Sequence, residues 1–336
     1  MAEFAAAREM RAGGEARYTR GVKGLRAGWF LVSLVTIFCA CRTPERVTYH
    51  ALESASERRT MAYAVYTPPG WDGETPLPLV VFLHGRGDDE RVLAERAAVV
   101  RRLDEWIRDG RLDPFVMVVP DGEQGFWTNW HDGSHAYEDY VVEEIIPAVR
   151  ADYPIAPGRE NLHLLGISMG GAGSLYMCIH HLEMFASATV LSAPVYDVQQ
   201  TMWFLSGKPL RGLPIDRVFG PPNLEKVEAS SPYTRLRSAE DLRGTKLLFG
   251  VGRIDLPGLL ESNRNLHRHL VAHDVPHHYL EYRGGHGWRS WSQLFPVALC
   301  LHMRGHACEL EKDRFYELEI DEAVIDLPLP VSGESQ

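Results

Sequence analysis

The chain has 336 residues, 45% of them hydrophobic, which is enough to bury one large core or two modest ones. Its formal net charge of -10 and the lack of a basic face in the body of the sequence argue against a nucleic-acid partner. No internal repeat suggests a solenoid.

The first 41 residues differ from the rest. A segment with more basic than acidic residues is followed by the uncharged run GWFLVSLVTIFCAC, which ends at Cys41. This order is typical of an export signal. The run is shorter than the roughly 20 residues of a spanning helix, so a permanent transmembrane anchor is the less favoured alternative.

The end of this run, FCAC, resembles the cleavage box of bacterial lipoproteins, in which a small residue precedes the lipidated cysteine. Lipidation of Cys41, which would attach the protein to a membrane through its N-terminus, and plain secretion both stay open. We expect residues 1–41 to be an export signal, residues 42–46 a linker, and the protein to be in the cell envelope or secreted.

The body of the chain opens with two segments, 47–52 and 60–71, that alternate apolar and polar residues. Such alternation is typical of half-buried strands, and we expect an antiparallel pair. Continuous apolar runs at 77–85 and 114–122 predict strands buried on both faces of a parallel sheet. Between these runs, residues 90–108 have the apolar spacing of a helix.

The alternation of helix and strand continues to residue 304. Residues 198–242, with clustered Gly and Pro, are expected to be an irregular excursion over the carboxyl edge of the sheet. One α/β domain, with a mostly parallel sheet and helices on both faces, accounts for residues 47–304, and residues 305–336 form an acidic C-terminal extension. The remaining elements are predicted as helices at 137–150, 169–183, 259–273 and from 288, and strands at 162–167, 187–194, 245–255 and 277–286.

Glycines crowd around a serine in the segment GISMGGAGSL. Gly166 and Gly170 lie two residues before and two after Ser168, where a nucleophile on a sharp turn from strand to helix leaves no room for a Cβ atom. The turn would hold the Ser168 hydroxyl at a helix N-terminus, with the amide of Met169 facing a developing oxyanion. A helix cap without chemistry is the alternative.

A nucleophilic serine needs a general base and a group that orients the base. The order expected along such a chain is nucleophile, acid, histidine. Asp255 ends the segment TKLLFGVGRID, and His286 stands at the end of the last predicted strand, in YRGGHGW. Both residues fall at carboxyl ends of strands, where α/β sheets place their sites. For Asp255 a helix-capping role is the alternative, and Glu261 is a weaker rival for the acid.

Two further features lie near these strand ends. The loop HGRGDDE, after the strand at 77–85, offers the amide of Arg86 as a second oxyanion donor. The loop EQGFWTNWHDG carries Trp127 and Trp130, whose flat rings could form a platform for a sugar or an aromatic acyl group, with rim packing as the alternative. No residue spacing favours a metal site, and the expected chemistry needs no cofactor.

Three cysteines follow the signal. The most plausible disulfide joins Cys300 to Cys308, and Cys178, in an apolar helical stretch, is expected to be a core residue.

Several of these segments together resemble one family of α/β hydrolases, the esterase D-like group, which includes S-formylglutathione hydrolases, feruloyl and acetyl-xylan esterases and mycolyltransferases. The marks are LVVFLHGRGDD, GISMGGAGSL, FASATVLSAP, the GRID turn and GGHGWRSW, and the resemblance covers about residues 47–304. It implies the α/β-hydrolase fold with a nucleophile elbow and a triad of Ser168, Asp255 and His286. The amides of Arg86 and Met169 would form the oxyanion hole.

The resemblance also implies an activity. We expect a serine esterase that hydrolyses a carboxylic ester, with a short or carbohydrate-linked acyl group, through an acyl-enzyme. Its substrate would be a small-molecule or carbohydrate ester. Acyl transfer to a sugar or lipid alcohol, and a non-catalytic surface protein that keeps a hydrolase fold, remain alternatives.

Overall fold

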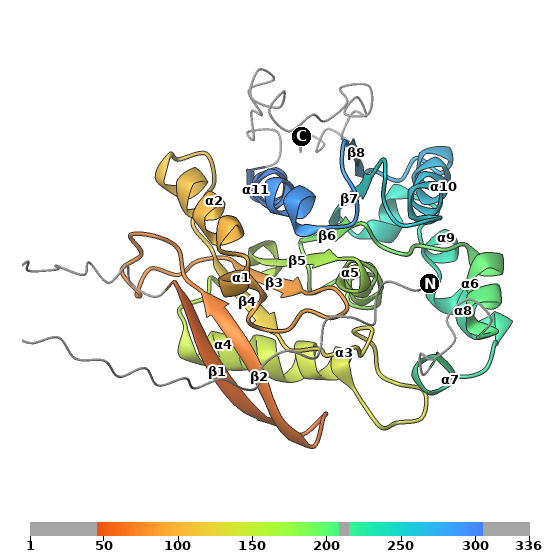
Figure 1. The fold of residues 1–336 in the computed structure, drawn as a ribbon, viewed down its shortest axis with the longest axis horizontal. Helices are drawn as coiled ribbons and strands as arrows, with labels where there is room; N and C mark the ends of the chain where they lie inside the picture. The colour runs from red at the N-terminus through yellow and green to blue at the C-terminus, as the bar shows by residue number, and fades with distance from the viewer. Residues whose placement is uncertain (1–45, 208–214, 305–336) are drawn as a thin grey trace, which may run out of the picture. The chain divides into compact units, whose positions relative to one another are not determined.

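The computed structural model describes residues 46–207 and 215–304 (Figure 1). Within them, eight strands form one sheet in the order β1-β2-β4-β3-β5-β6-β7-β8. The strands are β1 (Val47–Ser54), β2 (Arg59–Tyr66), β3 (Leu79–Leu83), β4 (Val116–Pro120), β5 (Leu162–Ile167), β6 (Ser187–Leu191), β7 (Lys246–Gly252) and β8 (His278–Tyr282).

The direction of the strands follows the sequence patterns. β1 pairs with β2 antiparallel, from Val47 opposite Tyr66 to Ser54 opposite Arg59, and β2 also runs antiparallel to β4. All other neighbours are parallel. Every residue of β3, β4, β5 and β6 is buried, whereas β1 exposes part of its length. The predicted antiparallel opening and the mostly parallel sheet are therefore confirmed.

Helices cover both faces of the sheet (Figure 1). On one face, Phe82 and Leu191 belong to a core that includes Leu103 and Phe295. On the other face, Val81 packs into a core with Leu175. The first face is covered by α1 (Val92–Glu95), α2 (Ala97–Arg108) and α11 (Trp288–Arg304), and the second by α3 (Tyr137–Asp139), a π-helical turn (Tyr140–Ile145), α4 (Ile146–Asp152), α5 (Met169–His180) and α10 (Leu259–Ala272).

The structure differs from the sequence predictions mainly in two places, besides strands β7 and β8, which end at Gly252 and Tyr282 rather than at 255 and 286. The helix expected over residues 90–108 breaks at Arg96, whose φ of -105° and ψ of 52° are not helical. Residues 198–242, expected to be irregular, include short helices where they are described, because Asp197, Asn223 and Ser231 cap them through their side chains. These are α6 (Val198–Leu205), α7 (Ile215–Val218), α8 (Leu224–Ser230), α9 (Pro232–Arg235) and a 3₁₀ turn (Ala239–Leu242).

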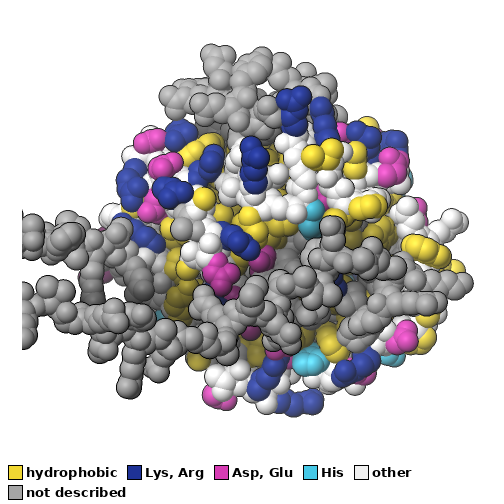
Figure 2. Space-filling view, viewed as in Figure 1, with side chains coloured by type: hydrophobic (Ala, Val, Ile, Leu, Met, Phe, Trp, Pro, Cys, Tyr) yellow, Lys and Arg dark blue, Asp and Glu magenta, His cyan; other side chains and the backbone are white. Residues whose placement is uncertain are grey.

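The surface of the described part carries charges of both signs side by side (Figure 2). No helix among the described residues is long and apolar enough to cross a membrane. The predicted export signal, Cys41 and the acidic extension from 305 lie outside the described residues. Cys178 is buried and free, as expected. Cys300 is disulfide-bonded, but Cys308 lies outside the described residues, so that pairing stays a prediction.

Candidate active site

Ser168 occupies the turn between β5 and α5 in a strained conformation, with φ 53° and ψ -117°. Its two flanking glycines are required by close approach of the backbone. A Cβ atom on Gly166 would lie 2.0 Å from the carbonyl oxygen of Gly170, and one on Gly170 would lie 1.9 Å from the carbonyl oxygen of Leu83. The turn can therefore form only because neither position carries a side chain, as the sequence predicted.

Two other strand ends bring an imidazole and a carboxylate to this serine. Ser168 Oγ lies 2.8 Å from Nε2 of His286, and His286 Nδ1 lies 2.7 Å from Oδ1 of Asp255. Since a carboxylate can only accept, Nδ1 carries the proton and Nε2 accepts from the Ser168 hydroxyl. The structure thus brings together three side chains that are far apart in the sequence.

The carboxylate of Asp255 has donors on both oxygens. Oδ1 accepts from the Leu256 amide at 2.8 Å as well as from His286, and Oδ2 accepts from the Ser192 hydroxyl at 2.6 Å and from the Gly252 amide at 3.1 Å. Burial alone would raise the pKa of Asp255, but the hydrogen bonds from His286 and Ser192 lower that pKa below its usual value. The carboxylate is therefore held ionised next to the imidazole.

The loop after β3 lies against the serine. A Cβ atom on Gly85 would be 3.4 Å from Cβ of Ser168, and Arg86 is the next residue of this loop. The Met169 amide is the first of α5. Within the described residues neither amide donates to a protein acceptor. Both amides are therefore available as donors, which is what an oxyanion requires.

His84, which the sequence analysis did not single out, holds this loop in place. Its Nδ1 lies 2.9 Å from the carbonyl oxygen of Gly85, and its Nε2 accepts from the Gly122 amide at 3.0 Å. Burial lowers the pKa of His84, so the ring is neutral with its proton on Nδ1. Its position next to Gly85 at the end of a strand was the available signal.

The prediction that the ring of Trp127 forms a substrate platform is wrong. Trp127 is only 1% exposed, and its Nε1 donates to the carbonyl oxygen of His84 at 3.1 Å. Phe126 and Trp127 both have left-handed φ values, 59° and 58°, and the Trp127 ring packs on Gly122 and Gly173. Trp127 is therefore a core residue that holds the backbone of His84, at the start of the loop after β3.

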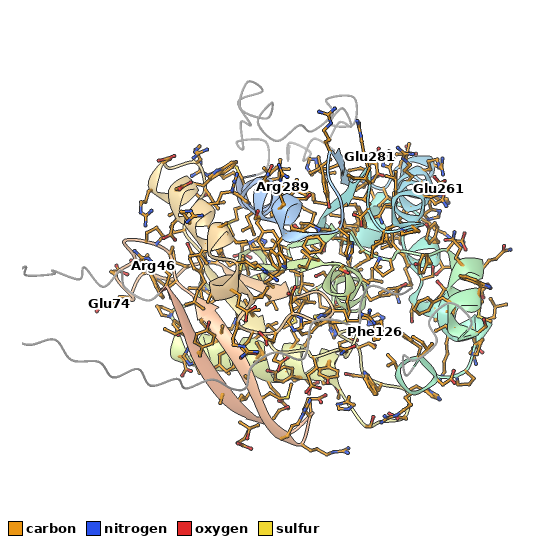
Figure 3. All side chains as sticks on the ribbon, in the orientation of Figure 1. Arg46, Glu74, Phe126, Glu261, Glu281 and Arg289 are labelled. Atoms are coloured by element: carbon orange, nitrogen blue, oxygen red, sulfur yellow. The ribbon has the colours of Figure 1, made fainter. Side chains whose placement is uncertain are left out.

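Trp130 is half-buried and lies in the same loop. Its Nε1 donates to the Gly125 carbonyl at 3.0 Å, and the guanidinium of Arg217 lies 5.3 Å from its ring centroid. Phe126, labelled in Figure 3, lies toward α7, with its ring 5.3 Å from that of Phe219. No contact among the described residues joins Trp130 to the serine, so its substrate-binding role stays a prediction.

The sequence did not predict a further group of polar contacts next to the Asp255 carboxylate. Ser192, Tyr282 and Trp291 share hydrogen bonds next to Asp255, and Trp288 Nε1 donates to Asp88 at 3.2 Å, which joins α11 to the loop after β3. Ser192 and Tyr282 each stand at the carboxyl end of a strand, a position that could have drawn attention to both. No group of three His, Cys, Asp or Glu side chains in the described ranges could hold a metal ion.

The sheet order, the helices on both faces and the serine on a strained turn from strand to helix define an α/β hydrolase. Solved structures share this fold. One is a ferulic acid esterase, with TM-score 0.65 and 22% identity over 77% of this chain and 97% of that one. Another is FphF, a fluorophosphonate-binding serine hydrolase of Staphylococcus aureus, with TM-score 0.63 and 24% identity over 76% of this chain and 98% of that one.

The chain belongs to the family described as "Putative esterase", whose model matches residues 54–302. It is 27% identical over 215 residues to an acetyl esterase of Caldicellulosiruptor saccharolyticus, across 58% of this chain and 76% of the relative. It is 24% identical over 160 residues to an endo-1,4-beta-xylanase/feruloyl esterase of Xylanibacter ruminicola, across 45% of this chain but only 22% of that relative. Family and fold together support carboxylic ester hydrolysis by a serine esterase.

Proposed function

We propose that this chain hydrolyses a carboxylic ester with Ser168 as nucleophile, His286 as general base and acid, and Asp255 as the group that orients the imidazole. The observation that carries the proposal is the continuous chain of hydrogen bonds from Ser168 Oγ through His286 to Asp255, at 2.8 and 2.7 Å. Ser168 is partly exposed, whereas the side chain of Asp255 is fully buried, so an ester can reach the hydroxyl but not the acid.

The reaction has two halves. In the first, Ser168 Oγ attacks the ester carbonyl carbon while its proton passes to Nε2 of His286, and that proton then leaves with the alcohol. In the second, water gives a proton to Nε2 and attacks the acyl carbon, and His286 then returns that proton to Ser168 Oγ as the bond to the serine breaks and the acid is released. The amides of Arg86 and Met169 stabilise the oxyanion of each tetrahedral intermediate, and a donor of this kind contributes roughly 10²- to 10³-fold in rate.

We propose an ester with a short or carbohydrate-linked acyl group as the substrate. The support is the pair of related proteins named acetyl esterase and endo-1,4-beta-xylanase/feruloyl esterase. A panel of esters with acetyl, feruloyl and longer acyl groups tests it. The highest kcat/KM is expected for acetyl or feruloyl esters, and a preference for long acyl chains would contradict it.

The nucleophile is tested by Ser168→Ala, with Ser206→Ala at the exposed end of α6 as the matched control. We expect Ser168→Ala to abolish turnover of p-nitrophenyl acetate and to keep the circular dichroism spectrum of the wild type, because it removes only the attacking oxygen. The control is expected to keep full activity. Turnover retained by a folded Ser168→Ala protein would mean that another residue is the nucleophile.

Export of the protein, with lipidation at Cys41 as one form of it, is a separate proposal that rests on the sequence of residues 1–41. Metabolic labelling with palmitate in a bacterial host tests the lipidated form. Label is expected on the intact protein and not on Cys41→Ala, and an unlabelled protein recovered from the medium would indicate plain secretion.

A further inference from the structure

Ser192, directly after β6, adopts a conformation that the local sequence does not require. Its φ is 51°, in the left-handed region that residues with a Cβ atom seldom occupy and that persists only where the surroundings over-determine it. Ser192 is completely buried, and its amide donates to the Gly250 carbonyl at 2.6 Å. The turn places the Ser192 hydroxyl within hydrogen-bonding distance of the carboxylate of Asp255.

The hydroxyl of Ser192 has three partners. It donates to Oδ2 of Asp255 at 2.6 Å, lies 2.6 Å from the hydroxyl of Tyr282 and accepts from Nε1 of Trp291 at 3.0 Å. Ser192 has one proton, and the carboxylate can only accept, so that proton goes to Asp255. The Tyr282 hydroxyl therefore donates to Ser192, as Trp291 does, and only Ser192 donates to the acid.

The hydrogen bonds of Ser192, Tyr282 and Trp291 lie next to both other members of the proposed triad, Asp255 and His286. Oδ2 of Asp255 takes the Ser192 bond, which leaves Oδ1 to face Nδ1 of His286. The ring of Trp291 lies edge-on to the His286 imidazole, 5.0 Å between centroids at 82°. Tyr282 and Trp291 are 3% and 5% exposed, so water does not compete for these bonds. Burial raises the pKa of Tyr282, which keeps its hydroxyl protonated.

We propose that Ser192, oriented by Tyr282 and Trp291, is a positioning residue that fixes the carboxylate of Asp255 in the rotation required to hold the His286 imidazole. The inference rests on the proposed function, because it assigns to Ser192 an effect that passes through the acid of the proposed triad. Without the Ser192 hydroxyl, Oδ2 keeps only the Gly252 amide, and the carboxylate can turn away from Nδ1.

The test compares Ser192→Ala and Tyr282→Phe with the wild type, by kcat and KM for p-nitrophenyl acetate. A hydrogen bond to a charged group is lost in the first variant, so we expect kcat to fall about 10- to 100-fold with KM within about two-fold. Tyr282→Phe keeps the Ser192 hydroxyl but frees it to rotate, and kcat is expected to fall about 3- to 10-fold.

The matched control is Tyr279→Phe, which removes a buried tyrosine hydroxyl from the same strand. That hydroxyl donates to Glu281, which is labelled in Figure 3, at 3.0 Å. Tyr279→Phe should lower the melting temperature as Tyr282→Phe does, yet leave kcat unchanged. An equal fall of kcat in both tyrosine variants would overturn the proposal.

A double-mutant cycle separates positioning from general damage. Ser192→Ala is expected to lower kcat in the wild type but by less than about two-fold in an Asp255→Ala background, because the effect passes through Asp255. An equal fall of kcat in both backgrounds, or an unchanged kcat in a folded Ser192→Ala protein, would overturn the positioning role of Ser192. If Ser192→Ala does not fold, Tyr282→Phe decides. Turnover retained by Ser168→Ala would instead overturn the proposed function.

Discussion

Two serines directly follow neighbouring strands of the sheet, and both have a left-handed φ. Ser168 follows β5 with φ 53°, and Ser192 follows β6 with φ 51°. The two turns are joined, since the Ser168 amide donates to the Leu191 carbonyl at 2.8 Å. Yet the first hydroxyl is partly exposed and meets an imidazole, whereas the second is buried and bonded to a carboxylate.

The difference shows that a strained turn aims a hydroxyl but does not make it reactive. The partner decides the chemistry. The imidazole of His286 can take a proton from Ser168, whereas Asp255, whose pKa is lowered in spite of burial because His286 and Ser192 donate to it, only holds the proton of Ser192. In the mechanism proposed above, Ser168 therefore reacts and Ser192 orients the acid.

The largest effect is expected from Asp255→Asn, which alters the partner of Ser192 and also the group bonded to the imidazole that meets Ser168. An amide nitrogen facing Nδ1 would force the imidazole proton onto Nε2, where it blocks acceptance from Ser168. We expect kcat to fall about 10⁴-fold, measured with p-nitrophenyl acetate. Asp104→Asn is the control, since Asp104 is buried and bonded to Tyr66 but far from this network, and it should lose stability while keeping kcat.

The Ser168 turn needs glycines, and the Ser192 turn, which continues into Ala193, does not. Gly170→Ala would place a Cβ atom 1.9 Å from the Leu83 carbonyl oxygen, and we expect a loss of at least about 3 kcal/mol in the free energy of unfolding. Gly171→Ala meets the Leu191 carbonyl oxygen only at 2.9 Å and should cost about 1 kcal/mol. Equal melting temperatures for both variants would contradict this account.

Substituting each serine by glycine distinguishes the effect of backbone strain on stability from the effect of hydrogen bonding. Ser168→Gly relieves a strained φ and leaves no buried donor unpaired, so its free energy of unfolding should stay within about 1 kcal/mol of the wild type or rise. Ser192→Gly leaves the buried donors of Tyr282 and Trp291 without their acceptor and should lose about 2 kcal/mol. Urea denaturation measures both. A larger loss of unfolding free energy for Ser168→Gly than for Ser192→Gly would contradict the view that Ser192, and not Ser168, is held by buried hydrogen bonds.

The smallest effect is the pH dependence of stability at Asp255. Its folded-state pKa lies below the usual 3.8, because donated hydrogen bonds outweigh burial. The carboxylate therefore stabilises the fold above about pH 4, and this contribution is lost as the pH falls through the folded-state pKa. The stability difference between wild type and Asp255→Asn should shrink from pH 6 to pH 3 in thermal denaturation. A stability difference between wild type and Asp255→Asn that grows as the pH falls would contradict the lowered pKa of Asp255.

The sequence predicted what depends on local patterns. Continuous apolar runs mark β3 to β6, and the glycines around Ser168 mark the turn, because each signal lies within a few residues. The positions of Asp255 and His286 followed from their places after strands, which parallel strands bring to one edge. These signals also carried the family resemblance, which the match to the esterase family confirmed.

The sequence did not show what depends on distant neighbours. The place of Ser192 after a strand is visible in the sequence, but its role appears only when β8 and α11 bring Tyr282 and Trp291 beside it. Trp127 was interpreted as part of a substrate platform because a flat ring complements a sugar or an aromatic acyl group. Its left-handed backbone and the space left by Gly173, 46 residues later in the chain, turn it inward.

The most direct test of the central claim, that Ser168 is the nucleophile activated by His286, is covalent labelling with a fluorophosphonate, followed by mass spectrometry of the digested protein. We predict one label per chain, on the peptide that contains Ser168, with loss of ester turnover in proportion to labelling and no label on Ser168→Ala. A label on any other residue that removes ester turnover, or full turnover by a protein labelled at Ser168, would contradict the account.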